Sequence, residues 1–355
     1  MKSVLRKLLP HTLIKKLKIA VDSFDRKFYP FFAKNSFLSS IYYCFFSTQF
    51  RREHKAVLQG RLQYQKSLHD IKQSSVLLRR NTHRLEKGLI MQPRRAIFAE
   101  AYIDETVDCF AKCLLSNELC AEELKWAQDV LVKYFNVTQS SVVLDSARQK
   151  FESLTLKSFD SSDESLPYQH QQRIESNVTQ EELHNLFKQR RSVRWYEQKP
   201  VEMSLLSQAV EMASQAPSAC NRQPFQFYVV TDMDKASDIA SIAMGTTGFS
   251  DNIPALIAVV GDLSAYPAER DRHVIYIDGG LVSMQLILAF ETLGLSSCPI
   301  NWPDIEICER KIAKKLNLAT HLRPIMLISV GHGDAKGQIP FSQKKGKSTL
   351  IKEVS

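Results

Sequence analysis

The chain has 355 residues, of which 44% are hydrophobic and 24% charged, and its formal net charge is +9. These values indicate an ordinary folded protein of one or two domains. No run of about 18 or more apolar residues occurs, so no membrane-spanning helix is predicted.

The seven cysteines lack the spacing of a disulfide framework, which indicates a reducing compartment. The cytoplasm is the expected location, with a peripheral position on the inner face of the membrane as an alternative. Cys109 and Cys113 would share one face of a helix as small core residues. No histidine follows them at zinc-ligand spacing, so no metal site is predicted.

The positive charge is unevenly distributed along the chain. The first hundred residues are strongly basic, whereas residues from about 101 to 182 lean acidic. This asymmetry is typical of a chain that meets a membrane surface, an acidic partner or nucleic acid, and it also fits two segments that neutralise each other. No nucleic-acid fold or stacking motif accompanies the basic residues, so nucleic acid is not a predicted partner.

Residues 1–20 alternate leucine and isoleucine with lysine and arginine at helical spacing, as a basic helix at a membrane interface does. Residues 28–50 contain ten aromatic side chains, but Lys34 and Asn35 interrupt them, so this segment is too short to span a bilayer. Either residues 1–50 make a peripheral membrane contact, or the aromatic face docks on the helices that follow. We favour docking, since aromatic stripes more often belong to a core.

Residues 51–98 are predicted to form helix with loops. Within them, residues 81–88 are polar and basic, and Gly88 is expected to cap the C-terminal end of a helix. His83, Arg84 and Lys87 either reach an anionic ligand or form a solvated helical face, and the solvated face is the preferred interpretation.

Three more helices are predicted at 99–115, 120–136 and 141–157. The polar residues 158–175 predict a loop, so an all-helical N-terminal region, 1–175, is expected to end there. From residue 176 to residue 355 helices and strands alternate in a second domain. Its helices are expected near 180–189, 202–215, 235–243, 275–293 and 305–316, and its strands near 225–231, 255–260, 297–300 and 325–330. The helix at 275–293 is apolar nearly all round, which favours an oligomer interface.

Two segments of the second domain carry the groups that a phosphate and a ring require. Residues 190–196, RRSVRWY, place three arginines and a serine together at a helix end. Arginine presents a rigid fork of donors that matches phosphate oxygens, and it stays charged at any working pH. Residues 216–225, APSACNRQPF, form a polar break between a helix and a strand. Together the two segments predict a cradle for a phosphate and a flat heterocycle.

These segments resemble the R-R-S-x-R and A-P-S-x-x-N-x-Q-P-W/F patterns of the nitroreductase family of FMN-dependent oxidoreductases. Two later segments, CPINW at 298–302 and SQKK at 342–345, resemble family segments in the same order, so the resemblance covers about residues 176–355. It implies an α+β fold with a central, mostly antiparallel sheet flanked by helices. It also implies a homodimer with FMN at the subunit interface.

The resemblance implies roles for the residues of the first two segments. Arg190, Arg191 and Ser192 would bind the FMN phosphate and ribityl chain. Arg194 would stabilise the N1/O2 edge of the reduced ring, where negative charge develops. The polar turn would contact the ring, usually from the partner subunit, through Pro217, Ser218, Ala219 and Asn221.

The later segments complete the implied site. Pro299, Ile300 and Asn301 would lie over the other edge of the flavin, where a backbone N–H faces N5. Trp302 departs from the family pattern and would stack in the substrate slot or narrow it. Lys344 or Lys345 would return to the phosphate in place of the arginine that usually closes this motif.

The function implied is transfer of hydride from NAD(P)H through flavin N5 to an unidentified small-molecule acceptor by a ping-pong mechanism, with no obligatory protein acid or base. The alternative is a flavin-binding or degenerate nitroreductase-fold module that its N-terminus docks on a membrane or on a surface-polysaccharide synthesis complex.

Overall fold

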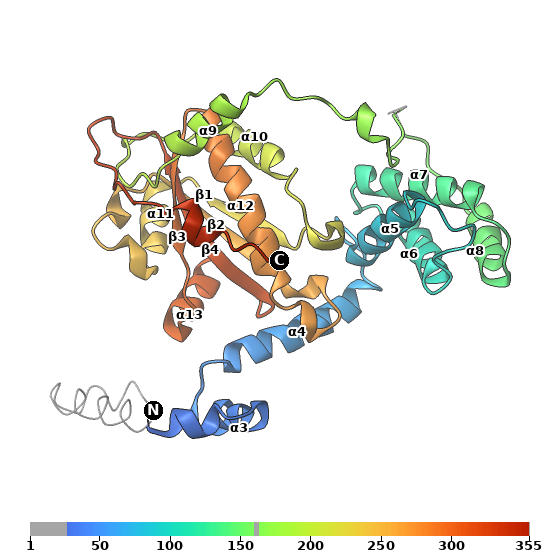
Figure 1. The fold of residues 1–355 in the computed structure, drawn as a ribbon, viewed down its shortest axis with the longest axis horizontal. Coiled ribbons are helices and arrows are strands. Elements are labelled where there is room, and N and C mark those ends of the chain that lie inside the picture. The colour runs from blue at the N-terminus through green and yellow to red at the C-terminus, as the bar shows by residue number, and fades with distance from the viewer. Residues whose placement is uncertain (1–26, 160–162, 355) are drawn as a thin grey trace. The chain divides into compact units, whose positions relative to one another are not determined.

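The structure is a computed structural model that describes residues 27–159 and 163–354 (Figure 1). Contacts between Cα atoms divide the chain into two compact units, residues 1–55 and 56–355. The domain boundary expected in the loop at 158–175 is a different division and stays a prediction. The basic helix expected at 1–20 lies outside the described residues.

The first unit is helical in its described part. It contains α3 (Ser36–Ile41), the π-helix η1 (Tyr42–Phe46) and the start of α4 (Arg51–Ser67). Helix α3 begins after Asn35, whose side-chain oxygen accepts a hydrogen bond from the Leu38 N–H at 2.9 Å. That bond satisfies one of the backbone donors left free at a helix start.

Four helices of the second unit pack around one apolar core. They are α5 (Val76–Leu89), α6 (Ile103–Leu115), α7 (Ala121–Val137) and α8 (Val142–Glu152). The three helices predicted between 99 and 157 are confirmed, although α8 ends five residues early, where the Ser153 N–H turns back to the carbonyls of Gln149 and Phe151. Cys109 and Cys113 lie buried in this core, as the shared helical face predicts.

The prediction that Gly88 caps a helix is wrong, because α5 continues through Gly88 to Leu89. The Phe98 ring packs so closely on this glycine that a Cβ atom built there would lie 2.2 Å from Phe98 Cε2. The glycine therefore permits a close approach rather than a helix end. Asn81 and Thr82 are fully buried, so this segment of α5 is not a solvated face as a whole.

The other elements of the second unit form a sheet with helices on both faces. The helices are α9 (Gln180–Gln189), α10 (Met203–Ala213), α11 (Met233–Ala240), α12 (Val274–Thr292), α13 (Glu306–Lys315) and the short α14 (Lys347–Leu350). Short 3-10 turns lie at His170–Gln172, Ala219–Asn221, Met244–Thr246, Ser250–Asn252, Leu263–Ala265 and Glu269–Asp271. The strands are β1 (Phe225–Val230), β2 (Ala255–Asp262), β3 (Ser296–Asn301) and β4 (Leu322–Gly331).

The four strands pair antiparallel in the order β1-β2-β4-β3, which confirms the expected α+β fold. Alternate residues of β2 belong to two cores, since Ala255, Ile257 and Val259 pack with α10 and α12, and their neighbours pack with α11 and α13. Strand β2 is therefore buried on both faces. Helix α4 joins this body through Ala56 and Val57, which pack with Leu263 and Ile275.

Helix α12 crosses the sheet (Figure 1). Of the described helices, the stretch Glu269–Thr292 is long and apolar enough to cross a membrane by length and composition, yet half of it is buried in the fold. An apolar stripe of α12 remains exposed, formed by Ile277, Leu281 and Met284. Their spacing puts these three side chains on one face.

The contact between Gly88 and Phe98 makes a prediction about stability. In an open helix, Gly→Ala raises stability by about 1 kcal/mol. In the Gly88→Ala variant the new methyl group meets the Phe98 ring, and overpacking costs about 1–3 kcal/mol. We expect a lower free energy of unfolding in urea than for the wild type. Lys87→Ala, one residue earlier and exposed, should be near neutral. A stabilised Gly88→Ala protein would show that the close packing is absent.

Candidate functional site

The arginine-rich segment is attached to the edge of the sheet. Arg190 ends α9, and Ser192 forms a parallel β-bridge with Ser297 of β3. The Val193 N–H donates to the Ser297 carbonyl at 3.0 Å, and the buried Tyr196 hydroxyl lies 2.8 Å from Ser329 Oγ in β4. These bonds hold the segment in a defined path beside β3.

This path brings the arginines to the C-terminal tail. A cavity of about 70 Å³ is lined by Arg190, Arg191, Ser192, Arg194, Pro340, Ser342 and Lys344. Four of these residues are cationic, two supply hydroxyl groups, and none is acidic. Crowded cations without a lining carboxylate make a site for an anion, and guanidinium forks suit the oxygens of a phosphate. Lys345, the other lysine considered from the sequence, does not line the cavity.

Arg194 lines the cavity, and its charge acts on Cys298 of β3. Its Nη1 atom donates to the Ser192 carbonyl at 3.3 Å, and its guanidinium carbon lies 5.7 Å from the centre of the Phe249 ring. Burial raises the pKa of the Cys298 thiol in β3, and the nearby Arg194 charge opposes that rise. The arginine therefore acts electrostatically on β3.

The backbone at 299–301 is at the open edge of the sheet. Strand β3 is the last strand of the sheet, so one of its edges has no neighbouring strand. Residues 192–193 bond to that outer edge only at Ser297. Within the described ranges, no backbone bond joins the outer edge of Pro299, Ile300 or Asn301 to another element. An unpaired backbone N–H at a free edge is available to a ligand, although Pro299 cannot supply one because proline has no N–H.

Trp302 is not part of that open edge. Its side chain is 7% exposed in the core that contains Ile300, and its Nε1 atom donates to Glu309 Oε1 at 2.7 Å. Glu309 in turn lies 3.7 Å from Arg323 Nη2. The structure thus places the indole in the core, and the expected role of Trp302 at the substrate slot stays a prediction.

The polar turn is bonded to α12. The Ser218 hydroxyl and the Ala219 N–H both donate to Asp278 Oδ2, at 2.7 and 3.0 Å, and the Gln223 N–H donates back to Ser218 Oγ at 2.8 Å. Cys220, Asn221 and Gln223 have φ of 53°, 50° and 50°. Left-handed backbone is costly for residues with a Cβ, so the bonds to Asp278 hold a strained turn in place.

Sequence reasoning missed a second support of this turn, from α5. Arg79 Nε donates to the Asn221 carbonyl at 2.9 Å, and Arg79 Nη1 pairs with the buried Glu123 Oε2 at 3.0 Å. Glu123 also accepts from Ser74 Oγ at 2.7 Å and from the Ser75 N–H at 2.8 Å. Arg79 and Asn221 are 142 residues apart, and no spacing rule links them.

The neighbouring basic residues of α5 are otherwise engaged. His83 lies 3.3 Å from Glu86, and the Arg84 guanidinium carbon lies 3.5 Å from the centre of the Tyr102 ring. Of the basic residues in this helix, Arg79 is thus the one that reaches the predicted site.

The two segments of the predicted site lie near opposite ends of α12 (Figure 1). The turn is bonded to Asp278 near the start of the helix, whereas Gln189 beside Arg190 donates to Glu291 near its end, at 3.4 Å. Thirteen residues of helix separate Asp278 and Glu291, which is about 20 Å at 1.5 Å per residue. The turn does not line the arginine cavity.

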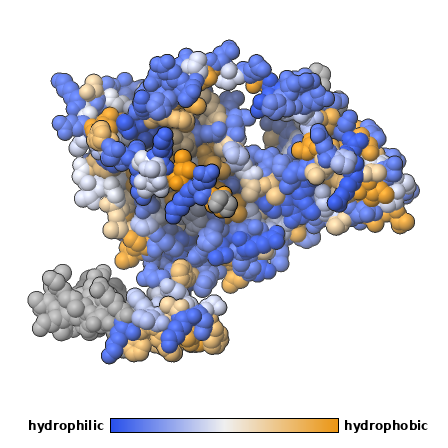
Figure 2. Space-filling view, in the orientation of Figure 1, coloured by the Kyte–Doolittle hydropathy of each residue, from blue (hydrophilic) through white to orange (hydrophobic). Residues whose placement is uncertain are grey.

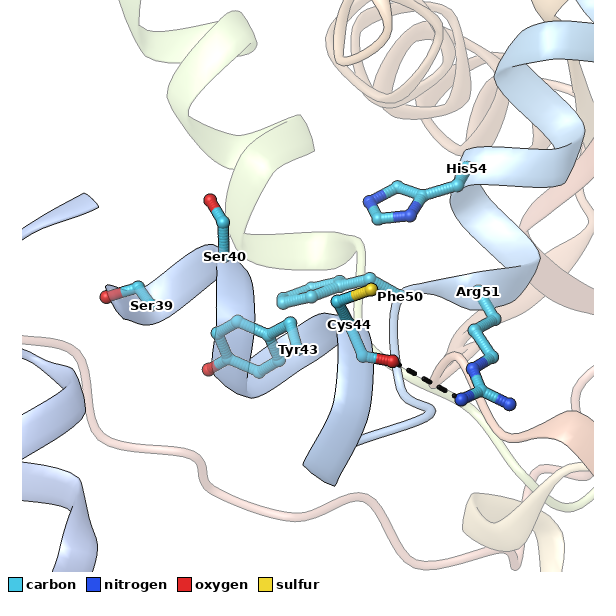
Figure 3. Close-up of a pocket in the computed structure, with 7 residues that line it drawn as sticks. All are labelled: Ser39, Ser40, Tyr43, Cys44, Phe50, Arg51 and His54. Carbon is cyan, nitrogen blue, oxygen red and sulfur yellow. Dashed lines mark hydrogen bonds between the residues drawn. The ribbon is translucent and has the colours of Figure 1, made fainter. Parts of the chain in front are cut away.

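A larger cavity, of about 350 Å³, lies in the first unit (Figure 3). Ser39, Ser40, Tyr43 and Cys44 line it from α3 and η1. Phe50 lines it from just before α4, and Arg51 and His54 line it from the start of α4. The Tyr43 and Phe50 rings meet edge to face with centres 4.6 Å apart. Arg51 Nη2 donates a long hydrogen bond to the Cys44 carbonyl at 3.4 Å. The cavity thus combines an aromatic wall with a guanidinium, an imidazole and two hydroxyl groups.

Comparison with known proteins finds similarity in the second half of the chain. Residues 187–251 and 243–332 match the model of the Nitroreductase family. YdgI of Bacillus subtilis (strain 168), provisionally named an NAD(P)H nitroreductase, is 27% identical over 193 residues, which are 44% of this chain and 90% of that protein. Iodotyrosine deiodinase 1 of Homo sapiens is 23% identical over 224 residues, 54% of this chain and 75% of that protein. A solved nitroreductase family protein from Streptococcus pneumoniae TIGR4 is 25% identical with a TM-score of 0.42, over 48% of this chain and 100% of the other.

The contact between α5 and the turn predicts a local effect of Arg79→Met. Loss of a hydrogen bond from a charged donor costs about 1.5–3 kcal/mol, so the Ala219 and Gln223 amides should exchange with deuterium about tenfold faster or more. The matched control is Arg80→Met, which removes the neighbouring ion pair with Glu105, at 3.2 Å, but no contact with the turn. Equal exchange at the turn in both variants would contradict the role of Arg79.

Proposed function

We propose, from the premise that residues 187–332 are an oxidoreductase domain of the nitroreductase family, that this chain binds FMN and transfers hydride from NAD(P)H to a small-molecule acceptor. The observation that carries the proposal is the cavity shared by the arginine segment and the C-terminal tail. Its donor set fits a phosphate monoester, because three guanidinium groups, one ammonium group and two hydroxyl groups face it without an acidic side chain.

FMN, when bound, would supply the redox chemistry, taking hydride from the nicotinamide and giving it to an acceptor that enters the same slot in turn, a ping-pong sequence. The protein would bind and orient the FMN. Arg190, Arg191, Ser192 and Lys344 would hold the phosphate and ribityl chain. Arg194 would offset the negative charge of the reduced ring at its N1/O2 edge.

The free edge of β3 supports the remaining contacts with the flavin. Pro299 has no N–H, but the outer edge of β3 at Ile300 and Asn301 has no partner strand in the described chain, and a backbone N–H there would face the hydride-accepting position of the ring. Such a donor orients the ring and polarises that position without a protein acid or base.

A homodimer would complete the site. The turn at 217–221 is held about 20 Å along α12 from the arginine segment, so a second copy would bring its own turn to the ring. The exposed stripe of Ile277, Leu281 and Met284 on α12 offers an apolar face for that second copy.

We assign the protein to the cytoplasm. All seven cysteines lie in described residues and all are free thiols, which is the usual state of cysteine in a reducing compartment.

The test is the visible absorption spectrum of the purified full chain, recorded before and after anaerobic addition of NADH or NADPH. A bound flavin that bleaches with either reductant supports the proposed oxidoreductase. A flavin that stays oxidised with both would favour the flavin-binding module as the function instead. A colourless protein that also fails to bind added FMN would refute the proposal.

The position of the two tail lysines makes a sharper prediction. Lys344→Met should weaken FMN binding about tenfold or more, because a charge-assisted hydrogen bond contributes about 1.5–3 kcal/mol. Lys345→Met, which removes the same charge one residue away but outside the cavity, should change the Kd by less than about threefold. Quenching of FMN fluorescence on titration measures both values, and an equal loss in the two variants would mean that general tail charge, rather than the cavity, binds the phosphate.

A further inference from the structure

The net charge of the chain resides in its first unit. Residues 1–55 contain twelve lysines and arginines and three aspartates and glutamates, a formal net charge of +9, which equals that of the whole chain. Residues 56–355 are therefore formally neutral. A charge confined to one compact unit points to a partner of opposite charge for that unit.

The same unit exposes large apolar side chains. Phe37 and Phe45 are 72% and 74% exposed, and Tyr29, Phe31 and Phe46 are also exposed. In Figure 2 the visible face of this unit has apolar residues beside hydrophilic ones. The basic residues of its described part are Lys27, Lys34, Arg51, Arg52 and Lys55, against one acidic residue, Glu53.

The segments that carry the exposed rings pack against one another through aromatic contacts. Tyr42 contacts Tyr29, Phe32 and Phe46 with ring centres 5.8, 5.3 and 6.1 Å apart. Aromatic pairs at these distances stabilise the helical segments that carry them. Phe37 and Phe45 are therefore presented to the outside by a packed support.

We propose that the first unit docks on an anionic lipid bilayer. Aromatic side chains next to lysine and arginine are the composition of interfacial membrane contacts, since the rings enter the headgroup layer while the cations meet anionic lipids. Duplex DNA also attracts cations, but it offers no apolar layer for exposed phenylalanines.

The cavity of Figure 3 gives this surface a place for a lipid headgroup. Arg51 and His54 line it with the hydroxyl groups of Ser39 and Ser40, and Tyr43 and Phe50 form an aromatic wall. A guanidinium has five N–H donors, so Arg51 retains donors for a phosphate besides its bond to the Cys44 carbonyl.

Co-flotation of the full chain with vesicles tests the proposal. We expect it to float with equimolar phosphatidylcholine and phosphatidylglycerol, and not with phosphatidylcholine alone. Each lysine or arginine near an anionic surface contributes about fivefold to partitioning, so raised salt should release the protein. The double variant Phe37→Ser/Phe45→Ser should lower the partition coefficient about tenfold or more, because it removes two apolar groups from the contact.

The matched control is Leu115→Ser/Val142→Ser, which makes the same kind of change at residues that are 85% and 90% exposed in the helical part, and it should float like the wild type. Circular dichroism checks that both double variants are folded. Failure to float with the anionic vesicles, or equal flotation of the phenylalanine variant and the wild type, overturns the proposal. So does salt-sensitive binding to duplex DNA without flotation, or self-association through Phe37 and Phe45 without flotation.

Discussion

The Asp278 carboxylate holds the strained half of the candidate site in place. It is 2% exposed in the apolar helix α12, and a carboxylate at that depth is costly unless donors reach it. Ser218 and Ala219 are those donors, so the turn and the helix stabilise each other. Arg79 adds a bond from α5 to the Asn221 carbonyl. Left-handed backbone at non-glycine residues persists only where the surroundings fix it in this way.

The helix that carries Asp278 also sets the distance between the parts of the site. Because α12 is rigid and packs along one sheet face, the turn and the arginine segment are kept apart within one chain. A site that uses both would then need the second copy that we propose. The same helix exposes an apolar stripe in the single chain, so one element accounts both for the separation and for the face that a second copy would cover.

Much of the fold was predictable from local patterns, and the supports of the site were not. Periodicity predicted α6 to α8 and all four strands because each signal lies within a few neighbouring residues. The Gly88 prediction failed because glycine is needed not only at a helix end but also where another side chain, here the Phe98 ring, packs closely on the helix backbone. Arg79 and Asp278 were missed because their partners are distant in sequence. Trp302 was expected to stack in the substrate slot or narrow it. The hydrogen bond of its indole N–H to the buried Glu309 was not foreseen, because no motif records such a contact.

The two cationic regions of the chain act over different distances. The arginines around the 70 Å³ cavity are half-buried, and the backbone of their segment is bonded to β3 through the Val193 N–H. In the proposed function they would recognise an anion by donor geometry, which salt weakens little. In the described part of the first unit Lys27, Lys34, Arg51 and Lys55 are exposed. Attraction from exposed charges acts over about 8 Å at physiological salt and depends on the number of charges. An anion-binding cavity in a neutral body therefore need not compete with a membrane surface for the same cations, and each function can be lost without the other.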